Sequence, residues 1–97
     1  MSTYVSLVRY TDQGIRNVKE SPTRLDAAKK AIQAGGGEIK QFFLAMGAYD
    51  IVIISEAPND ETAATMMLGL ASLGNVRTET LRVFTESEFR KIISSIR

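Results

Sequence analysis

The sequence predicts an α+β domain in which helices cover one face of a four-stranded antiparallel sheet. Two observations favour this class. Four segments rich in β-branched and aromatic residues alternate with helical segments in the order strand, helix, strand, strand, helix, strand. The two middle strands are separated by only Gly47 and Ala48, and so short a connection requires antiparallel neighbours. One layer of helices leaves the second face of such a sheet without helices.

The first strand is expected over residues 3–10, where "TYVSLVRY" contains several β-branched and aromatic side chains. A short helical turn over residues 14–20 leads into the main helix. We expect Ser21 to cap this helix with Pro22 at its first helical position, and the glycines at 35–37 to end it.

The middle hairpin is expected to pair "EIKQFFLAM" (38–46) with "YDIVIISEA" (49–57). Asn59 then caps a second helix that closes at Gly74. Residues 75–84 form the fourth strand.

The last helix opens at Thr85, which has the spacing of a capping box with Glu88. Its apolar residues recur at helical spacing and form one stripe, which consists of Phe89, Ile92, Ile93 and Ile96. The complete order is that of the ferredoxin-like fold with an added C-terminal helix.

The composition limits the functions that this chain can have. Its 97 residues, 44% of them hydrophobic, suit one small domain over residues 1–97. A formal net charge of +1 with intermixed signs lacks the basic surface that nucleic acid requires, so we expect no nucleic-acid partner. The chain has no His and no Cys, which removes thiol nucleophiles, Cys/His zinc sites and catalytic pairs built on His. We therefore expect no cofactor and no metal site.

The apolar segments of the chain are short. The longest run, at residues 51–54, cannot cross a bilayer, and "MSTYVSLVRY" lacks the pattern of a signal peptide. We therefore expect a cytoplasmic protein with no membrane partner. The glycines of "AGGGE" follow a helix, whereas a phosphate-binding loop precedes one, so we interpret them as a helix end. Asp60 and Glu61 beside Asn59 are interpreted as part of a helix cap.

The middle hairpin is apolar on both faces, since Phe42, Phe43 and all of residues 51–54 are apolar. A sheet face without helices normally carries polar residues. Burying four or five more large side chains at about 1.5–3 kcal/mol each gives roughly 10 kcal/mol, which is comparable to the whole stability of such a domain. We therefore expect a second subunit stacked sheet to sheet, in a homodimer or a higher homo-oligomer.

The stretch "MGAYDIVIISEAPND", together with "TDQG", "GNVRTETLRVF" and "TESEF", resembles the GYD-domain proteins, and the similarity runs from Tyr4 through Phe89. The resemblance implies a ferredoxin-like fold of the dimeric α/β-barrel kind, in which two sheets face each other around an interior with room for a small molecule. It implies no particular reaction.

Tyr49 and Asp50 are the candidate catalytic residues. A phenol at a barrel mouth can donate to a ligand oxygen, and a neighbouring carboxylate can accept a proton. Adjacent residues of a strand point to opposite faces, so both line one cavity only where the strand bulges. In the structural alternative, Gly47 supplies the turn, Asp50 bonds turn backbone or a helix terminus, and Tyr49 packs across the dimer.

Shared strand parity predicts a pocket on the face that we expect to line the barrel. Hydroxyls, aromatic rings and one guanidinium suit a small, partly apolar ligand with an anionic group. The candidate ligand-binding residues are Tyr4, Ser6, Tyr10, Gln41, Phe43, Tyr49, Thr78, Thr80 and Arg82. Arg77 and Glu79 are then expected on the helix side. The alternative is a filled core between sheets, with the hydroxyls bonded to one another.

Three functional hypotheses follow from the sequence. The first is a noncatalytic binding or regulatory protein that holds an unidentified small molecule between the sheets of a homodimer. The second is a cofactor-independent enzyme, monooxygenase-like or isomerase-like, that uses Tyr and Asp acid–base groups. The third is a structural module that buries the sheet against a different protein.

Overall fold

Four antiparallel strands form one sheet in this computed structural model, which describes residues 1–97. They are β1 (Ser2–Tyr10), β2 (Glu38–Leu44), β3 (Ile51–Ala57) and β4 (Val76–Val83). The strand order is β2-β3-β1-β4, so β3 and β1 are central and β2 and β4 are the edges. Both the α+β class and the antiparallel pairing of the middle hairpin are confirmed.

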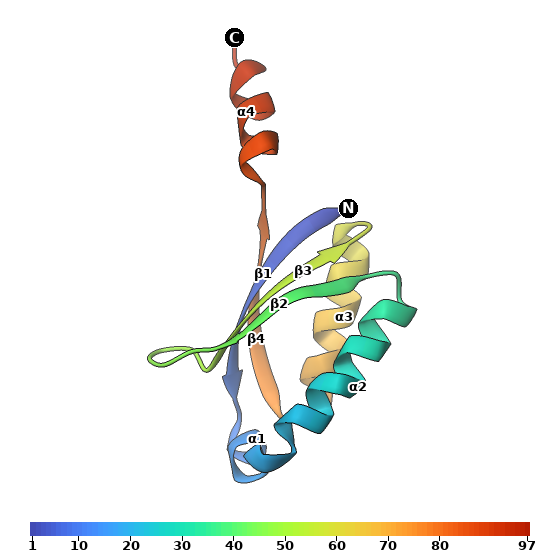
Figure 1. The fold of residues 1–97 in the computed structure, drawn as a ribbon, viewed down its shortest axis with the longest axis vertical. Coiled ribbons are helices and arrows are strands. Elements are labelled where there is room, and N and C mark those ends of the chain that lie inside the picture. The colour runs from blue at the N-terminus through green and yellow to red at the C-terminus, as the bar shows by residue number, and fades with distance from the viewer.

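The main helices lie on one face of this sheet (Figure 1). The helical segments are α1 (Asp12–Arg16), the 3-10 turn η1 (Val18–Glu20), α2 (Ser21–Ala34), α3 (Asp60–Ser72) and α4 (Glu86–Ser94). α2 and α3 pack mainly on the sheet and little on each other. α4 continues past the end of β4 and projects away from the sheet. The molecule is 52 Å long, 31 Å wide and 18 Å thick.

Local hydrogen bonds explain where α3 and α4 begin. The side chain of Asn59 accepts from the Thr62 amide at 2.9 Å, as expected of a cap. Thr85 and Glu88 form the predicted capping box: the Glu88 amide donates to the Thr85 hydroxyl at 3.2 Å, and the Thr85 amide donates to the Glu88 carboxylate at 2.9 Å. α4 is therefore ordered by its own first turn.

The start of α2 differs from the expectation. Ser21 is the first helical residue and does not cap the helix. The reason is that η1 runs directly into α2, so no extended residue precedes the helix. The Ser21 hydroxyl instead bonds the hydroxyl of Tyr10 at 2.9 Å and accepts from Arg24 at 3.1 Å.

The middle hairpin has a longer connection than predicted. β2 ends at Leu44 and β3 begins at Ile51, so six residues join them instead of two. The Ala45 amide donates to the Asp50 carbonyl at 2.8 Å and closes the base of this loop. Gly47 lies at a φ of +123°, a conformation that side chains with a Cβ rarely adopt.

The core lies between the sheet and the helices. Only twelve of the 97 residues are buried, among them Tyr4, Val8 and Ile53 on the sheet and Met67 on α3. Such a core is small for one chain of this length.

Candidate functional site

The sheet has one face that no helix covers, which we call the open face (Figure 1). Its residues alternate with the buried ones along each strand. The open face consists of Gln41 and Phe43 on β2, Val52, Ile54 and Glu56 on β3, Thr3, Val5, Leu7 and Arg9 on β1, and Arg77, Glu79, Leu81 and Val83 on β4.

The centre of the open face is apolar. One row across the sheet runs Gln41, Ile54, Val5 and Leu81, and the next runs Phe43, Val52, Leu7 and Glu79. Phe43 and Leu81 are each 50% exposed. The large apolar side chains of these two rows form a contiguous patch, which is typical of an interaction surface.

Charged residues bound this patch at both ends of the strands. Arg9 and Arg77 are direct cross-strand partners at one end, and Glu56 and Glu38 are direct partners at the other. Lys40 lies 3.6 Å from Glu38, whereas Glu56 and both arginines form no ion pair within the chain. Like charges opposite each other destabilise a sheet, so Glu56 and the two arginines favour a counter-charge from outside the chain.

Tyr49 crosses the arginine end of the open face. Its ring lies 4.6 Å from the guanidinium carbon of Arg9, and its hydroxyl donates to the Glu79 carboxylate at 3.1 Å. Arg9 also donates to the Ala48 carbonyl at 2.7 Å. A polar hollow of about 200 Å³ lies here, lined by Leu7, Arg9, Tyr49, Arg77, Thr78 and Glu79.

Asp50 bonds the backbone of the neighbouring strand. Its carboxylate accepts from the Tyr10 amide at 2.9 Å, and its own amide donates to the Val8 carbonyl at 2.9 Å. Asp50 thus extends the ladder between β3 and β1 by one side-chain bond, while Tyr49 points to the open face. This geometry favours the structural interpretation of Asp50 and separates it from the hollow at Tyr49.

The orientation expected for most of the candidate ligand-binding residues is wrong. Gln41, Phe43 and Tyr49 lie on the open face as expected. The other six belong to the helix side of the sheet, and these are Tyr4, Ser6, Tyr10, Thr78, Thr80 and Arg82. Arg77 and Glu79 lie on the open face and not under the helices.

The hydroxyls of the helix side bond to one another and to the helices. Ser6 is fully buried, lies 2.9 Å from the Thr80 hydroxyl and donates to the Met67 sulfur at 3.4 Å. Tyr10 reaches Ser21 at the start of α2. Because these hydroxyls are hydrogen-bonded within the chain, a strand face that carries them can line the core. An assignment of faces from polarity alone therefore places them on the wrong side of the sheet.

Tyr4 and Arg82 contact the first turns of α3 and α4. The Tyr4 hydroxyl donates to Asp60 at 2.5 Å, and Arg82 lies 4.0 Å from both Asp60 and Glu88. Burial, followed by the hydrogen bond to Asp60, raises the pKa of the Tyr4 phenol above its ordinary value. The hydrogen bond from the Thr85 backbone holds the pKa of Glu88 below its ordinary value.

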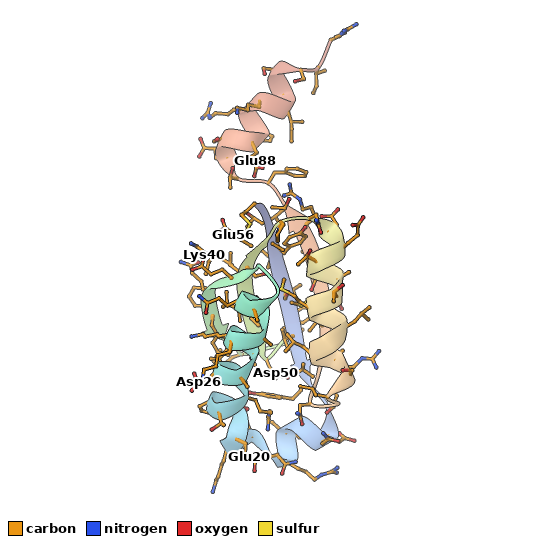
Figure 2. All side chains as sticks on the ribbon, turned by 90° about the vertical axis from the view of Figure 1, so that its right-hand side faces the viewer. Glu20, Asp26, Lys40, Asp50, Glu56 and Glu88 are labelled. Atoms are coloured by element: carbon orange, nitrogen blue, oxygen red, sulfur yellow. The ribbon has the colours of Figure 1, made fainter.

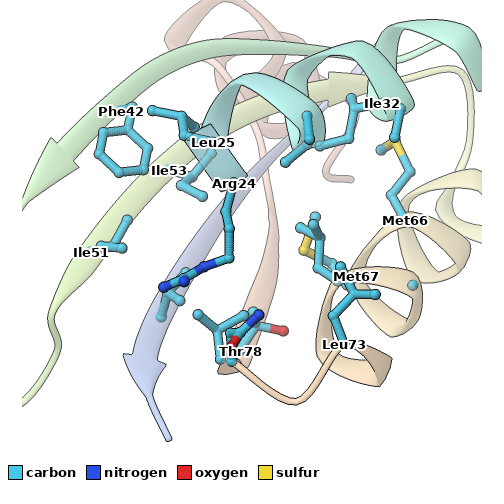
Figure 3. Close-up of a pocket in the computed structure, with 18 of the residues that line it drawn as sticks. Arg24, Leu25, Ile32, Phe42, Ile51, Ile53, Met66, Met67, Leu73 and Thr78 are labelled. Atoms are coloured by element: carbon cyan, nitrogen blue, oxygen red, sulfur yellow. The ribbon is translucent and has the colours of Figure 1, made fainter. Parts of the chain in front are cut away.

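A second hollow, which we call the helix groove, lies between α2 and α3 and has a volume of about 560 Å³ (Figure 3). Its floor includes Phe42, Ile51 and Ile53 of the sheet. Fifteen of its 22 lining residues are hydrophobic, so it suits an apolar occupant and not a polar metabolite. The apolar faces of the two helices are visible in the sequence, but no sequence signal indicates that the helices stand apart.

Two further features concern the side chains and the helices. No group of three or more Asp or Glu side chains is arranged to hold a metal ion. No helix combines the length and the apolar composition that a membrane span requires.

Comparison with known proteins places this geometry in a family. The GYD domain model matches residues 4–93, nearly the whole chain. A relative from Thermus thermophilus, described as a glutamine synthetase and cystathionine beta-lyase binding protein, is 33% identical over 82 residues, which cover 84% of this chain and 86% of the relative. A crystal structure of a protein from Thermus thermophilus aligns with a TM-score of 0.56 and 28% identity, over 88% of this chain and 95% of that one. The chain therefore belongs to the GYD domain family.

Proposed function

We propose that this chain is a noncatalytic binding protein that pairs through its open face into a sheet-to-sheet homodimer and docks, as a dimer, onto a partner enzyme. The observation that carries the proposal is the contiguous apolar centre of the open face, which the single chain leaves in water. A second copy is the occupant that this face fits best.

The charges at the ends of the open face support pairing of two identical copies. A two-fold axis that reverses the strand direction brings the arginine end of one copy, Arg9 and Arg77, against the glutamate end of the other, Glu56 and Glu38. The same operation stacks the two apolar rows on each other. Both like-charge pairs then gain counter-charges, which is the complementarity that fixes orientation in an interface.

The relative from Thermus thermophilus supports an enzyme as the class of partner. That protein is described by its binding to glutamine synthetase and cystathionine beta-lyase, and it aligns with most of this chain. A dimer closed through the open face leaves the outer helix surfaces of both copies available for such enzymes. Asp50 is engaged with strand backbone instead of a reactive partner, which further supports binding over catalysis.

Two measurements test the proposal. Light scattering and sedimentation over a dilution series are expected to give a dimer that dissociates at low concentration. Calorimetric titration with the purified glutamine synthetase and cystathionine β-lyase of the organism that makes this chain is expected to show saturable binding to at least one of them. A monomer at every concentration contradicts the pairing, and the absence of binding to both enzymes contradicts the choice of partner.

The hollow at Tyr49 favours a second candidate function, the binding of a small anion between the sheets. Arg9 and Arg77 stand side by side there, and Arg77 forms no ion pair within its own chain. Titration with phosphate and with succinate tests this role, with Arg77→Gln as the variant expected to lose binding. Binding that survives Arg77→Gln unchanged contradicts this location.

A further inference from the structure

We propose that α4 is an intermolecular arm whose apolar stripe docks in the helix groove of a second copy. The α4 stripe consists of Phe89, Ile92 and Ile93, which are between 46% and 55% exposed. Ile96, expected on the same helix, lies beyond its end at Ser94 and is 69% exposed. α4 makes no substantial packing contact with its own sheet or helices, and Figure 2 shows it standing clear of them. An ordered helix with one apolar side in water is a binding element without its receptor.

The spacing of the stripe is that of a helix that binds in a groove. Its three residues occupy positions i, i+3 and i+4, which are anchor positions of amphipathic helices seated in hydrophobic grooves. The helix is already closed by the Thr85–Glu88 capping box and by Arg90, which donates twice to Glu86 at 2.8 and 3.0 Å. Docking therefore does not have to order the arm first.

The helix groove has the complementary shape. Its lining includes small residues on both helices, Ala28 and Ala31 on α2 and Thr65 and Gly69 on α3, beside larger ones such as Leu70. A Cβ built on Gly69 meets nothing within 4 Å, so the space is open at that point. Small residues on the walls and large ones on the arm are the size match that lets a third helix approach closely. The nine residues of α4, about 13 Å of helix, fit within the length of α3.

The receptor must be a second copy because the arm is directed away from its own groove. Only Phe84 and Thr85 lie between β4 and α4. The ion pair of Arg82 with Glu88, at 4.0 Å, holds the first turn of α4 at the end of the strand. Figure 1 shows the arm continuing the line of β4, beyond the end of the sheet.

Arm and groove are different surfaces, so this contact is heterologous and links copies head to tail. The groove lies on the opposite side of the sheet from the open face, and the two contacts can coexist. The arm contact does not depend on the open-face dimer, and it predicts an assembly larger than a dimer where both occur.

Disulfide trapping tests the contact directly, because the chain has no cysteine of its own. Gly69→Cys protein is mixed with Ile92→Cys or Ile93→Cys protein and oxidised, with Ser94→Cys, on the polar side of the arm, as the matched control. A covalent heterodimer from Gly69→Cys with an apolar-side variant, and not with Ser94→Cys, is the expected result. Equal yields with Ser94→Cys, or no heterodimer from either pair at concentrations where the protein is associated, overturn the proposal.

A chain that carries both Gly69→Cys and Ile93→Cys distinguishes docking within one copy from docking between two. If the arm reaches its own groove, this chain closes an internal disulfide at high dilution and stays monomeric, which overturns the proposal. If the arm reaches a second copy, dilution abolishes the bond.

Two variants without cysteine provide an independent measurement. Gly69→Leu fills the groove in open space and improves the helix propensity of α3, so any loss of assembly does not come from unfolding. Ile93→Lys places a charge on the stripe, and Ser94→Lys is its control. Gly69→Leu and Ile93→Lys are each expected to weaken the head-to-tail association about 10- to 100-fold in sedimentation experiments, with Ser94→Lys unchanged. Unaltered association in Gly69→Leu, with the fold intact, contradicts the groove as receptor.

Discussion

Replacement of Leu81 by glutamine tests the proposed open-face dimer at its apolar centre. Leu81 lies on the edge strand β4, pairs with Val5 across the sheet and is 50% exposed in the single chain. The substitution keeps a side chain of similar volume and removes most of its apolar character. We expect the fold to persist and the dimer to weaken.

The size of the effect follows from the exposed half of the side chain. Complete burial of a leucine contributes about 1.5–3 kcal/mol, so covering the remaining half contributes about 0.7–1.5 kcal/mol per copy. A two-fold interface contains the residue twice, which gives about 1.5–3 kcal/mol per dimer. The dimer Kd is therefore expected to rise about 10- to 100-fold, since about 1.4 kcal/mol corresponds to a factor of ten.

Sedimentation equilibrium over a dilution series measures this Kd, and circular dichroism checks that the fold is retained. Leu68→Gln is the matched control, because Leu68 is 72% exposed on α3 and lies neither on the open face nor in the helix groove. An unchanged Kd in Leu81→Gln, or an equal rise in Leu68→Gln, would refute the assignment of the interface to the open face.

The remaining predictions concern the stability of the single chain. Asp50→Ala leaves the Tyr10 amide without its acceptor and is expected to lower the free energy of unfolding by about 1–3 kcal/mol. Tyr49→Phe removes only the exposed hydrogen bond to Glu79 and is expected to change the free energy of unfolding by less than about 0.5 kcal/mol. Equal effects of the two variants in urea unfolding contradict the structural role of Asp50. Gly14→Ala would place a Cβ 1.9 Å from the Asn75 carbonyl oxygen and is expected to lower the free energy of unfolding by at least about 1–3 kcal/mol. Gly69→Ala places its Cβ in open space and is expected to raise the free energy of unfolding by up to about 1 kcal/mol. Thermal unfolding distinguishes the two signs. Because the pKa of Tyr4 is raised, the folded chain retains a proton that the unfolded chain loses above its ordinary pKa of 10.0. The contribution of Tyr4 to the free energy of unfolding is fully present below that pH, and it is lost as the pH rises through the pKa of Tyr4 in the folded chain. Urea unfolding between about pH 8 and pH 11 is expected to show this fall in the original chain and to lose that component in Tyr4→Phe.

Most of the fold can be predicted from the sequence because its signals are local. The Asn59 cap and the Thr85–Glu88 capping box act within one turn of helix, and both begin helices where the sequence predicts them. The start of α2 escapes such a prediction because η1 supplies a helical entry that a capping pattern does not reveal. The hairpin loop is longer than its glycine signal suggests. Asp50 bonds β1 through its amide and its carboxylate, and the pairing of β2 with β3 ends at Leu44 and Ile51.

The candidate site is harder to predict because sequence parity does not say which face the helices cover. The usual rule places the more polar face in water, yet the core of this sheet contains Ser6, Ser55 and Thr80. The opposite face carries Val5 and Leu7 and remains open. Strand parity identifies the core face reliably only where the other face is exposed to solvent. Where the second face is an interface, the hydroxyl-bearing face can be the internal one, provided that each hydroxyl finds a partner.

The proposed assembly links the stability of the fold to association. With twelve buried residues, the chain has a small core, and three apolar surfaces stay uncovered: the open face, the helix groove and the α4 stripe. A partner that binds only the folded state adds its binding free energy to the free energy of unfolding. In the proposed assembly, a second sheet covers the open face, and the α4 arm of another copy fills the helix groove on the other side. The proposal thereby gives a physical reason for the hollow between α2 and α3: two helices leave part of the sheet bare, and a third helix from another copy would cover it.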